Sequence, residues 1–220
     1  MATITRRMVL LAGAGAVTRP AFAATLMPDA PGKLTLTSAA GGLVALRSDN
    51  VAGEVLLPAG RARLVAVLPI AGRDIVAVGF ADDPTGGGGD LELVAFVGWD
   101  GSWLRVLALD VLGWQGMDGS LLWSRMAATS DRMKLRIERD TAGPRAGRTR
   151  AWEHWTDYFV WQEGGALADA PVRPALPETW QARLAQRRKR AAVLLSAPMT
   201  AVTPATIADI GFSGLFVSSF

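Results

Sequence analysis

The feature that most constrains the fold is the spacing of turn residues. From Ala24 onward, short apolar runs are separated by Gly, Pro and Asp-Gly signals at intervals of roughly 8 to 15 residues, which is the pattern of an all-β domain. The runs are rich in the Val, Leu and aromatic residues that favour strands. Strands are predicted at 33–37, 42–47, 54–57, 63–68, 74–80, 91–99, 102–109, 120–127, 132–139 and 151–161. We therefore expect a mainly β fold, an antiparallel meander that forms a sandwich or barrel-like domain with a C-terminal α-helix.

Two local patterns support the meander. Segment 132–138 alternates strictly, which places Met133, Leu135 and Ile137 on one face and the charged residues in water. An Asp-Gly pair at residues 100–101 recurs at residues 118–119, in both cases between apolar runs. Each pair predicts a two-residue hairpin turn, because glycine adopts positive φ without a steric penalty.

Helices are expected only near the C-terminus. Pro177 and Glu178 predict a helix start, and Pro198 ends the segment. Its apolar residues, which fall near one face, are Trp180, Leu184, Ala191 and Leu195. Its basic run lies towards the C-terminal end, where the helix dipole favours positive charge, and consists of Arg187, Arg188, Lys189 and Arg190. Thr203-Pro204 begins a second short helix that Gly211 ends. The expected layout is an export signal at 1–23, an all-β domain at 24–176, and a helix and tail at 177–220 packed on the same domain.

The first 23 residues have the composition of a cleavable leader. Arg6-Arg7 precedes a short run of apolar and small residues, which is too short to span a bilayer, and Ala21-Phe22-Ala23 forms a small-x-small cleavage site. The pair Arg6-Arg7 after Thr5, the weakly hydrophobic Ala/Gly core and the basic Arg19 resemble a bacterial twin-arginine (Tat) signal peptide. The resemblance implies export by the Tat translocase to a periplasmic or secreted location. A general secretory leader is the alternative. No transmembrane segment is expected in the mature chain.

Composition excludes several function classes. The chain of 220 residues has no cysteine and one histidine, so disulfides, thiolate nucleophiles and Cys/His zinc sites are ruled out. Its formal charge is +3, but residues 1–23 hold three arginines and no acidic residue, so removing them leaves a neutral domain. Global electrostatics therefore gives no reason to expect a nucleic-acid partner. We expect no cofactor and no metal.

The richest candidate site is the segment 152–161. As a strand it places Trp155, Asp157, Phe159 and Trp161 on one face, and residues 154, 156, 158 and 160 on the other. In a ligand surface the indoles would stack on a flat ligand such as a sugar, with polar neighbours supplying directional hydrogen bonds. The alternative is that the aromatic rings are packing residues. The ligand-binding candidates are Trp152, His154, Trp155, Asp157, Tyr158 and Trp161.

Other motifs are weaker. A serine triad would have His154 as its only base, and no G-x-S-x-G elbow is present. A pair of catalytic carboxylates among Glu153, Asp157 and Glu163 stays open. The acidic, glycine-rich loop at 82–92 reads better as a long hairpin than as a calcium site. The basic clusters, Arg145, Arg148 and Arg150, and Arg183 with Arg187 to Arg190, read better as solvated surface than as contacts to lipid or polyanion.

Three functions follow from these observations. We expect a non-catalytic periplasmic binding or interaction module for an envelope ligand or protein, with a glycan as one ligand class. A periplasmic hydrolase that uses carboxylates near His154 is an alternative from a different class. A purely structural accessory of the envelope is the third.

Overall fold

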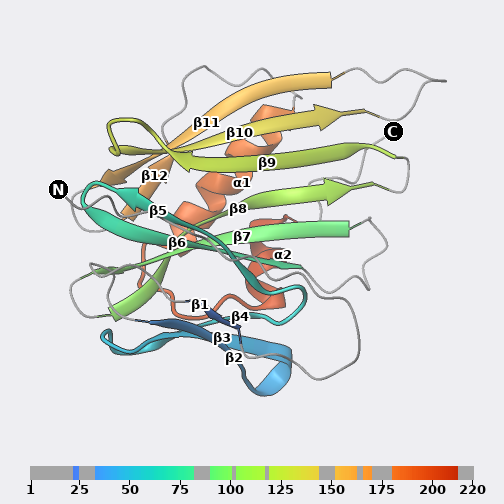
Figure 1. Cartoon of the computed structure of the whole chain (residues 1–220). Coiled ribbons are helices and arrows are strands. Elements are labelled where there is room, and N and C mark those ends of the chain that lie inside the picture. The colour runs from blue at the N-terminus through green and yellow to red at the C-terminus, as the bar shows by residue number, and fades with distance from the viewer. Residues whose placement is uncertain are drawn as a thin grey trace.

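The structure of the chain is a computed structural model that describes residues 22–24, 33–81, 90–100, 103–116, 119–143, 152–162, 166–169 and 180–212. It confirms a mainly β fold built from two antiparallel sheets and C-terminal helices (Figure 1). The smaller sheet has the order β1-β2-β3-β4 and the larger has the order β12-β11-β10-β9-β8-β7-β6-β5. The elements are β1 (Phe22–Ala24), β2 (Leu34–Ser38), a 3-10 turn (Ala40–Gly42), β3 (Leu43–Ser48), β4 (Glu54–Pro58), β5 (Arg63–Ile70), β6 (Arg73–Ala81), β7 (Asp90–Asp100), β8 (Trp103–Gln115), β9 (Leu121–Ala128), β10 (Lys134–Ala142), β11 (Trp152–Gln162), β12 (Ala166–Asp169), α1 (Trp180–Leu194) and α2 (Pro204–Ile210).

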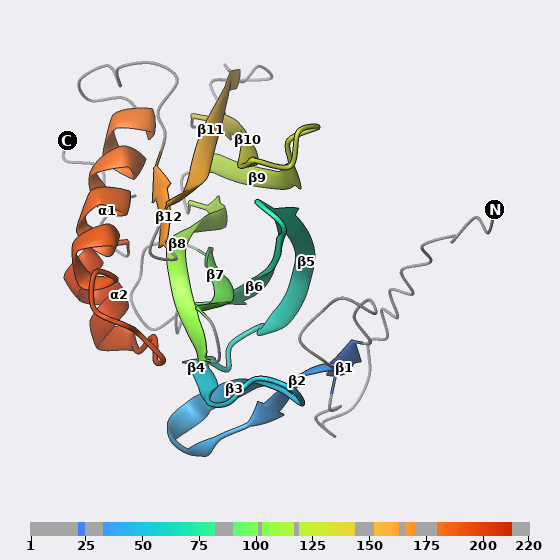
Figure 2. The ribbon, with the colours of Figure 1, turned by 90° about the vertical axis from the view of Figure 1, so that its left-hand side faces the viewer.

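The larger sheet is a meander that folds over on itself at the β8–β9 connection. β8 and β9 pair over only three positions, Gly113↔Trp123 to Gln115↔Leu121. Beyond this corner β5–β8 and β9–β12 separate into two facing layers, as Figure 2 shows, so the domain is sandwich-like and not a closed barrel. Residues of both layers meet between them, where the rings of Phe96 and Phe159 lie 5.9 Å apart.

A second core lies on the other side of β6–β8. Here the buried residues of β6, β7 and β8 pack against the small sheet and the two helices. Segment 199–202 ties these parts together, because Leu56 N–H of β4 donates to Thr200 O and Val106 N–H of β8 donates to Met199 O. The small sheet is thereby bonded to the large one through the chain that joins α1 to α2.

The second helix has the ends that the sequence predicts. Thr203 is the N-cap of α2 and forms a capping box with Thr206, which satisfies backbone N–H groups of the first turn. Gly211 follows the helix with φ of 80°, a left-handed conformation that glycine adopts freely. Both signals are local in sequence, and both are confirmed.

The predicted strands are all present, with boundaries that differ by a few residues. β8 is longer than predicted and continues to Gln115, and β12 was not predicted. Met133 is 53% exposed in the turn before β10, so its predicted place beside Leu135 and Ile137 is wrong.

The two Asp-Gly turns also differ from the prediction. Asp100 pairs with Trp103, so the first connection lies one residue later, outside the described residues. In the second, Gly116 N–H donates to Ser120 O and Gly119 has φ of 81°, which makes the loop longer than two residues. None of the described helices is long and apolar enough to span a membrane.

Candidate functional site

β11 divides the predicted site residues between two environments. Its alternation is confirmed, because Asp157 and Phe159 are buried while the residues between them are more exposed. Trp155 and Trp161 share the inward face with Asp157, and both pack at the edges of the cores. The other three candidates, Trp152, His154 and Tyr158, lie on the outward face. The six candidates therefore do not form one surface.

The outward side carries a pair of exposed indoles. Trp152 of β11 and Trp123 of β9 are 44% and 56% exposed, and their ring centroids lie 6.3 Å apart. The His154 ring lies 6.5 Å from the Trp152 ring, with the two planes within 13° of parallel. Large apolar side chains are seldom left in water as a group without an interaction to serve.

Between these rings β10 supplies an acidic residue, Asp140, and β9 supplies Arg125. Asp140 is the register partner of both Trp123 and His154, which brings the three side chains into one row across the sheet. One Asp140 oxygen accepts a hydrogen bond from His154 Nδ1, and the other accepts one from Arg125 Nη2 at 3.1 Å. A carboxylate can only accept, so Nδ1 carries the proton and Nε2 is the ring nitrogen left to meet a ligand. We call Trp123, Arg125, Asp140, Trp152 and His154 the aromatic face.

Tyr158 lies two outward positions beyond His154 on the same strand. Its ring is 6.0 Å from the ammonium group of Lys134. Tyr158 therefore extends the outward surface along β11, away from the two indoles.

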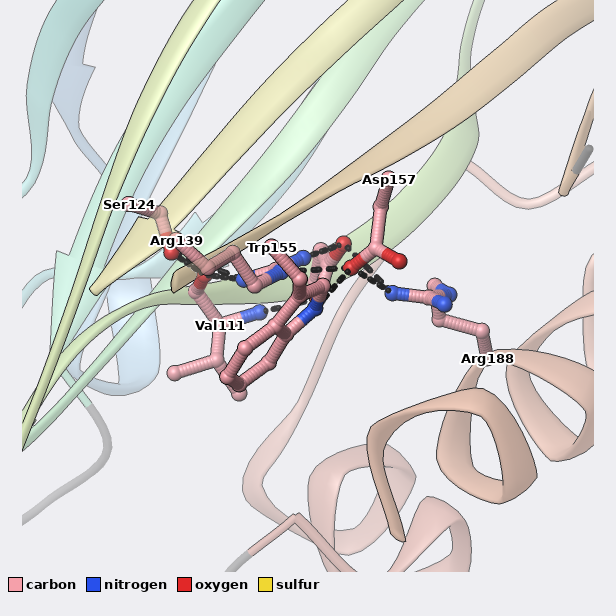
Figure 3. A network of polar contacts seen from close by, with 7 residues as sticks. Val111, Ser124, Arg139, Trp155, Asp157 and Arg188 are labelled. Carbon is pink, nitrogen blue, oxygen red and sulfur yellow. Dashed lines mark hydrogen bonds and ion pairs between the residues drawn. The ribbon is translucent and has the colours of Figure 1, made fainter. Parts of the chain in front are cut away.

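The inward face holds a buried network of four charged residues that joins three strands to α1 (Figure 3). Arg139 of β10 donates from Nε to Asp157 Oδ2 at 2.7 Å, and its Nη2 pairs with Asp110 of β8. Arg188 of α1 reaches the same Asp157 oxygen at 2.9 Å. With two carboxylates and two guanidinium groups, these four residues balance in charge. We call Asp110, Arg139, Asp157 and Arg188 the buried quartet.

Neutral groups complete the hydrogen bonding of the quartet. Arg139 Nη1 donates to Val111 O at 3.0 Å and to Ser124 Oγ at 2.7 Å. Trp155 Nε1 donates to Asp157 at 3.1 Å. A buried charge of this kind is tolerated only when it is paired and hydrogen-bonded, and that condition is met here.

The environment of Asp157 fixes its protonation state. Burial acts to raise its pKa, but the positive charges and hydrogen bonds of Arg139 and Arg188 outweigh burial and hold the pKa below the usual carboxyl range. Asp157 is therefore ionised at neutral pH, and its negative charge is compensated by the two arginines. It is unsuited to act as a proton donor or to contact a ligand from solvent.

The remaining predicted site residues take other roles or lie outside the description. Trp161 lies 5.0 Å from the guanidinium of Arg73 in a cation–π contact. Glu153 is exposed at the start of β11. Glu163, the basic residues 145, 148 and 150, and most of the acidic loop at 82–92 fall outside the described residues. Among the described residues no three His, Asp or Glu side chains gather as metal ligands.

Five residues of the aromatic face and the buried quartet were missed from the sequence, and a sixth, Arg188, was assigned to solvated surface; the five are Asp110, Trp123, Arg125, Arg139 and Asp140. Asp140 lies on β10, next to β11, and Trp123 lies on β9, one strand further, and only the pairing register brings them to His154. Arg188 falls four residues after Leu184, on the buried side of α1, so its predicted exposure is wrong. Arg139 continues the alternation of Leu135 and Ile137, which was the available signal that its side chain points inward.

Comparison with protein-family models, curated proteins and solved structures gives no match.

Proposed function

We propose that the protein is an exported, non-catalytic binding module whose ligand lies against the aromatic face. The observation that carries this proposal is the pair of exposed indoles, Trp123 and Trp152, whose ring centroids lie 6.3 Å apart on β9 and β11 of the larger sheet. Tryptophan is the side chain that contributes most often to binding energy at interfaces, because it is large and has few rotatable bonds. An antiparallel sheet fixes the distance between the two rings.

The chemistry of the aromatic face favours a polyhydroxylated ring, and we propose a glycan as the ligand class. The indole faces offer flat apolar area to the C–H groups of a sugar ring. The His154 ring is stacked beside Trp152, and its Nε2 can form a hydrogen bond with a sugar hydroxyl, which both donates and accepts. Arg125 and Asp140 are paired with each other, which favours a neutral ligand over a strongly charged one.

The leader at residues 1–23 supports placing this activity outside the cytoplasm. A twin-arginine signal would deliver the domain already folded to the periplasm or beyond, where envelope glycans are found. Export and the periplasmic location are part of the proposal.

A hydrolase that uses carboxylates near His154 has less support. Asp157 points inward and is held by two arginines. Asp140 contacts His154, but its other oxygen is bonded to Arg125, and the described residues bring no second exposed carboxylate into contact with that histidine. The observed contacts fit a fixed hydrogen-bonding residue better than an acid–base pair.

The test is a binding screen against glycans and peptidoglycan fragments, followed by intrinsic tryptophan fluorescence. The account predicts a hit, and then at least a tenfold weaker affinity by calorimetry for Trp123→Ala and for Trp152→Ala, since a central aromatic contributes upwards of about 1.4 kcal/mol. Met133→Ala is the control, because Met133 is also exposed and apolar but lies in the β9–β10 turn. Unchanged fluorescence across the whole panel would overturn the glycan assignment.

A further inference from the structure

The outer side of α1 has a strongly one-sided charge. Its fifteen residues, WQARLAQRRKRAAVL, include five basic residues and no acidic one. The quartet neutralises one of them, Arg188, inside the domain. Of the other four, Lys189 and Arg190 are exposed, and Arg183 and Arg187 are partly buried. Figure 2 shows α1 at the periphery of the molecule, with the sheets on one side of it only.

The helix dipole does not account for these charges. The basic run lies in the C-terminal half of α1, as predicted, but none of the basic residues lies in the last turn, where the dipole acts most strongly. Arg183, Arg187 and Arg190 follow one ridge at helical spacing. Partial burial, and after it the like charges of Arg190 and Arg183, lower the pKa of Arg187.

Arg187 is held by neutral acceptors. Its Nε donates to Gly211 O at 2.8 Å, and its Nη1 donates to Gln186 Oε1 at 3.0 Å. These bonds orient the guanidinium but leave its positive charge in place. The ridge therefore presents a fixed positive field to whatever lies outside α1.

Exposed aliphatic side chains adjoin the basic residues. Val193 is 73% exposed and lies four residues after Lys189, and Leu194 is 36% exposed and lies four residues after Arg190. Basic residues beside exposed aliphatic ones are typical of helices that adsorb to membrane surfaces, where the charges meet lipid headgroups and the apolar side chains enter the interface. A soluble polyanion would match the charges but would leave Val193 and Leu194 without a function.

We propose that the outer face of α1, formed by Arg183, Arg187, Lys189, Arg190, Val193 and Leu194, docks the protein onto an anionic phospholipid surface. This surface is separate from the aromatic face, so lipid docking and ligand binding are independent. A protein that uses both would hold a ligand close to a membrane.

The test is co-sedimentation of the full chain with phosphatidylcholine vesicles that do or do not contain phosphatidylglycerol. We expect Lys189→Gln/Arg190→Gln to bind the anionic vesicles about 25-fold more weakly than wild type, at about fivefold per basic side chain. The control is the double variant Arg47→Gln/Arg61→Gln, which removes the same amount of positive charge at two exposed sites outside α1. It should bind the anionic vesicles as wild type does. Residues 1–23 are present in every variant, so any membrane binding of their own is common to all.

Val193→Gln separates lipid from polyanion. We expect it to weaken vesicle binding several-fold and to leave retention on heparin unchanged. Equal binding of wild type and the Lys189/Arg190 variant to anionic vesicles would overturn the proposal. So would an equal loss in the Arg47/Arg61 control, because the effect would then follow net charge. If Val193→Gln binds vesicles as wild type does while heparin competes with them, the face is a polyanion site and the lipid assignment is wrong.

Discussion

At the scale of single residues, Asp157 is the clearest case of a side chain whose role depends on its neighbours. In the sequence it is one acidic residue in a polar and aromatic stretch, and it was a natural candidate to contact a ligand. In the structure it accepts hydrogen bonds from Arg139, Arg188 and Trp155 and is closed off from solvent. His154, three residues earlier on the outward face of β11, has a side chain that is 67% exposed and can contact a ligand from solvent.

The low pKa of Asp157 predicts how stability depends on pH. A carboxyl whose folded-state pKa is depressed stabilises the fold fully above its unfolded value of about 4, and that contribution is lost as the pH falls through the folded value. Urea unfolding between neutral pH and pH of about 2.5 should therefore show the free energy of unfolding falling below pH of about 4. The fall should be shallower in Asp157→Asn, which has no proton to take up at this site. Identical slopes in the two proteins would show that Asp157 is not held ionised by its arginines.

At the scale of elements, the quartet is the polar anchor of α1 on the sandwich. Leu184 and Ala191 lie on either side of Arg188 on the buried side of the helix. Arg188 also lies 5.7 Å from the ring of Phe159, so its guanidinium contacts an aromatic face as well as carboxylates. Within this apolar contact, Arg188 forms ion pairs with Asp157 and Asp110 that help to position the helix.

Removing two paired members of the quartet should cost less stability than the sum of removing each one alone. Arg188→Met is expected to lower the free energy of unfolding by about 3 to 5 kcal/mol, because it leaves buried negative charge uncompensated. Combining it with Asp157→Asn should lower stability by less than the sum of the two single changes. Chemical denaturation of wild type, the two single variants and the double variant gives this coupling energy. Lys189→Ala changes an exposed neighbour and is the control; its free energy of unfolding should stay within about 0.5 kcal/mol of that of wild type. Strict additivity would mean that the two side chains do not form the pair described.

The sequence predicts those elements whose signals are local. Apolar runs and turn residues locate the strands, and Thr203 and Gly211 mark both ends of α2, because each signal acts within a few residues. The aromatic face and the quartet depend on pairing between distant segments. Trp123 meets Trp152 only through the register of β9, β10 and β11, and Arg188 meets Asp157 only once α1 has docked. No local pattern encodes such partners. The periodicity of β10 is consistent with an inward Arg139, but the basic run that contains Arg188 was predicted to lie in solvent, and Arg188 is buried.

At the scale of the whole molecule, the expected leader overlaps the small sheet. Cleavage after Ala23 would remove two of the three residues of β1, which pairs with β2. The buried leucines and valines of β2, β3 and β4 would be retained, so the small sheet keeps its core after processing. Export therefore need not disturb the sandwich or its two proposed surfaces.

The export route has a direct test. Replacing Arg6-Arg7 by Lys-Lys should retain the chain in the cytoplasm, because a twin-arginine receptor reads that pair. Cell fractionation followed by immunoblotting measures the outcome. Continued export of the variant would point to a general secretory leader.

The central claim is that the aromatic face, and not the aromatic residues turned inward, binds the ligand. The most direct measurement is the shift of the indole N–H signals in the NMR spectrum as a glycan identified by the screen is added. The account predicts that the signals of Trp123 and Trp152 move, while that of Trp155, whose N–H is bonded to Asp157, stays in place. Movement of the Trp155 signal with Trp123 and Trp152 unchanged would contradict it.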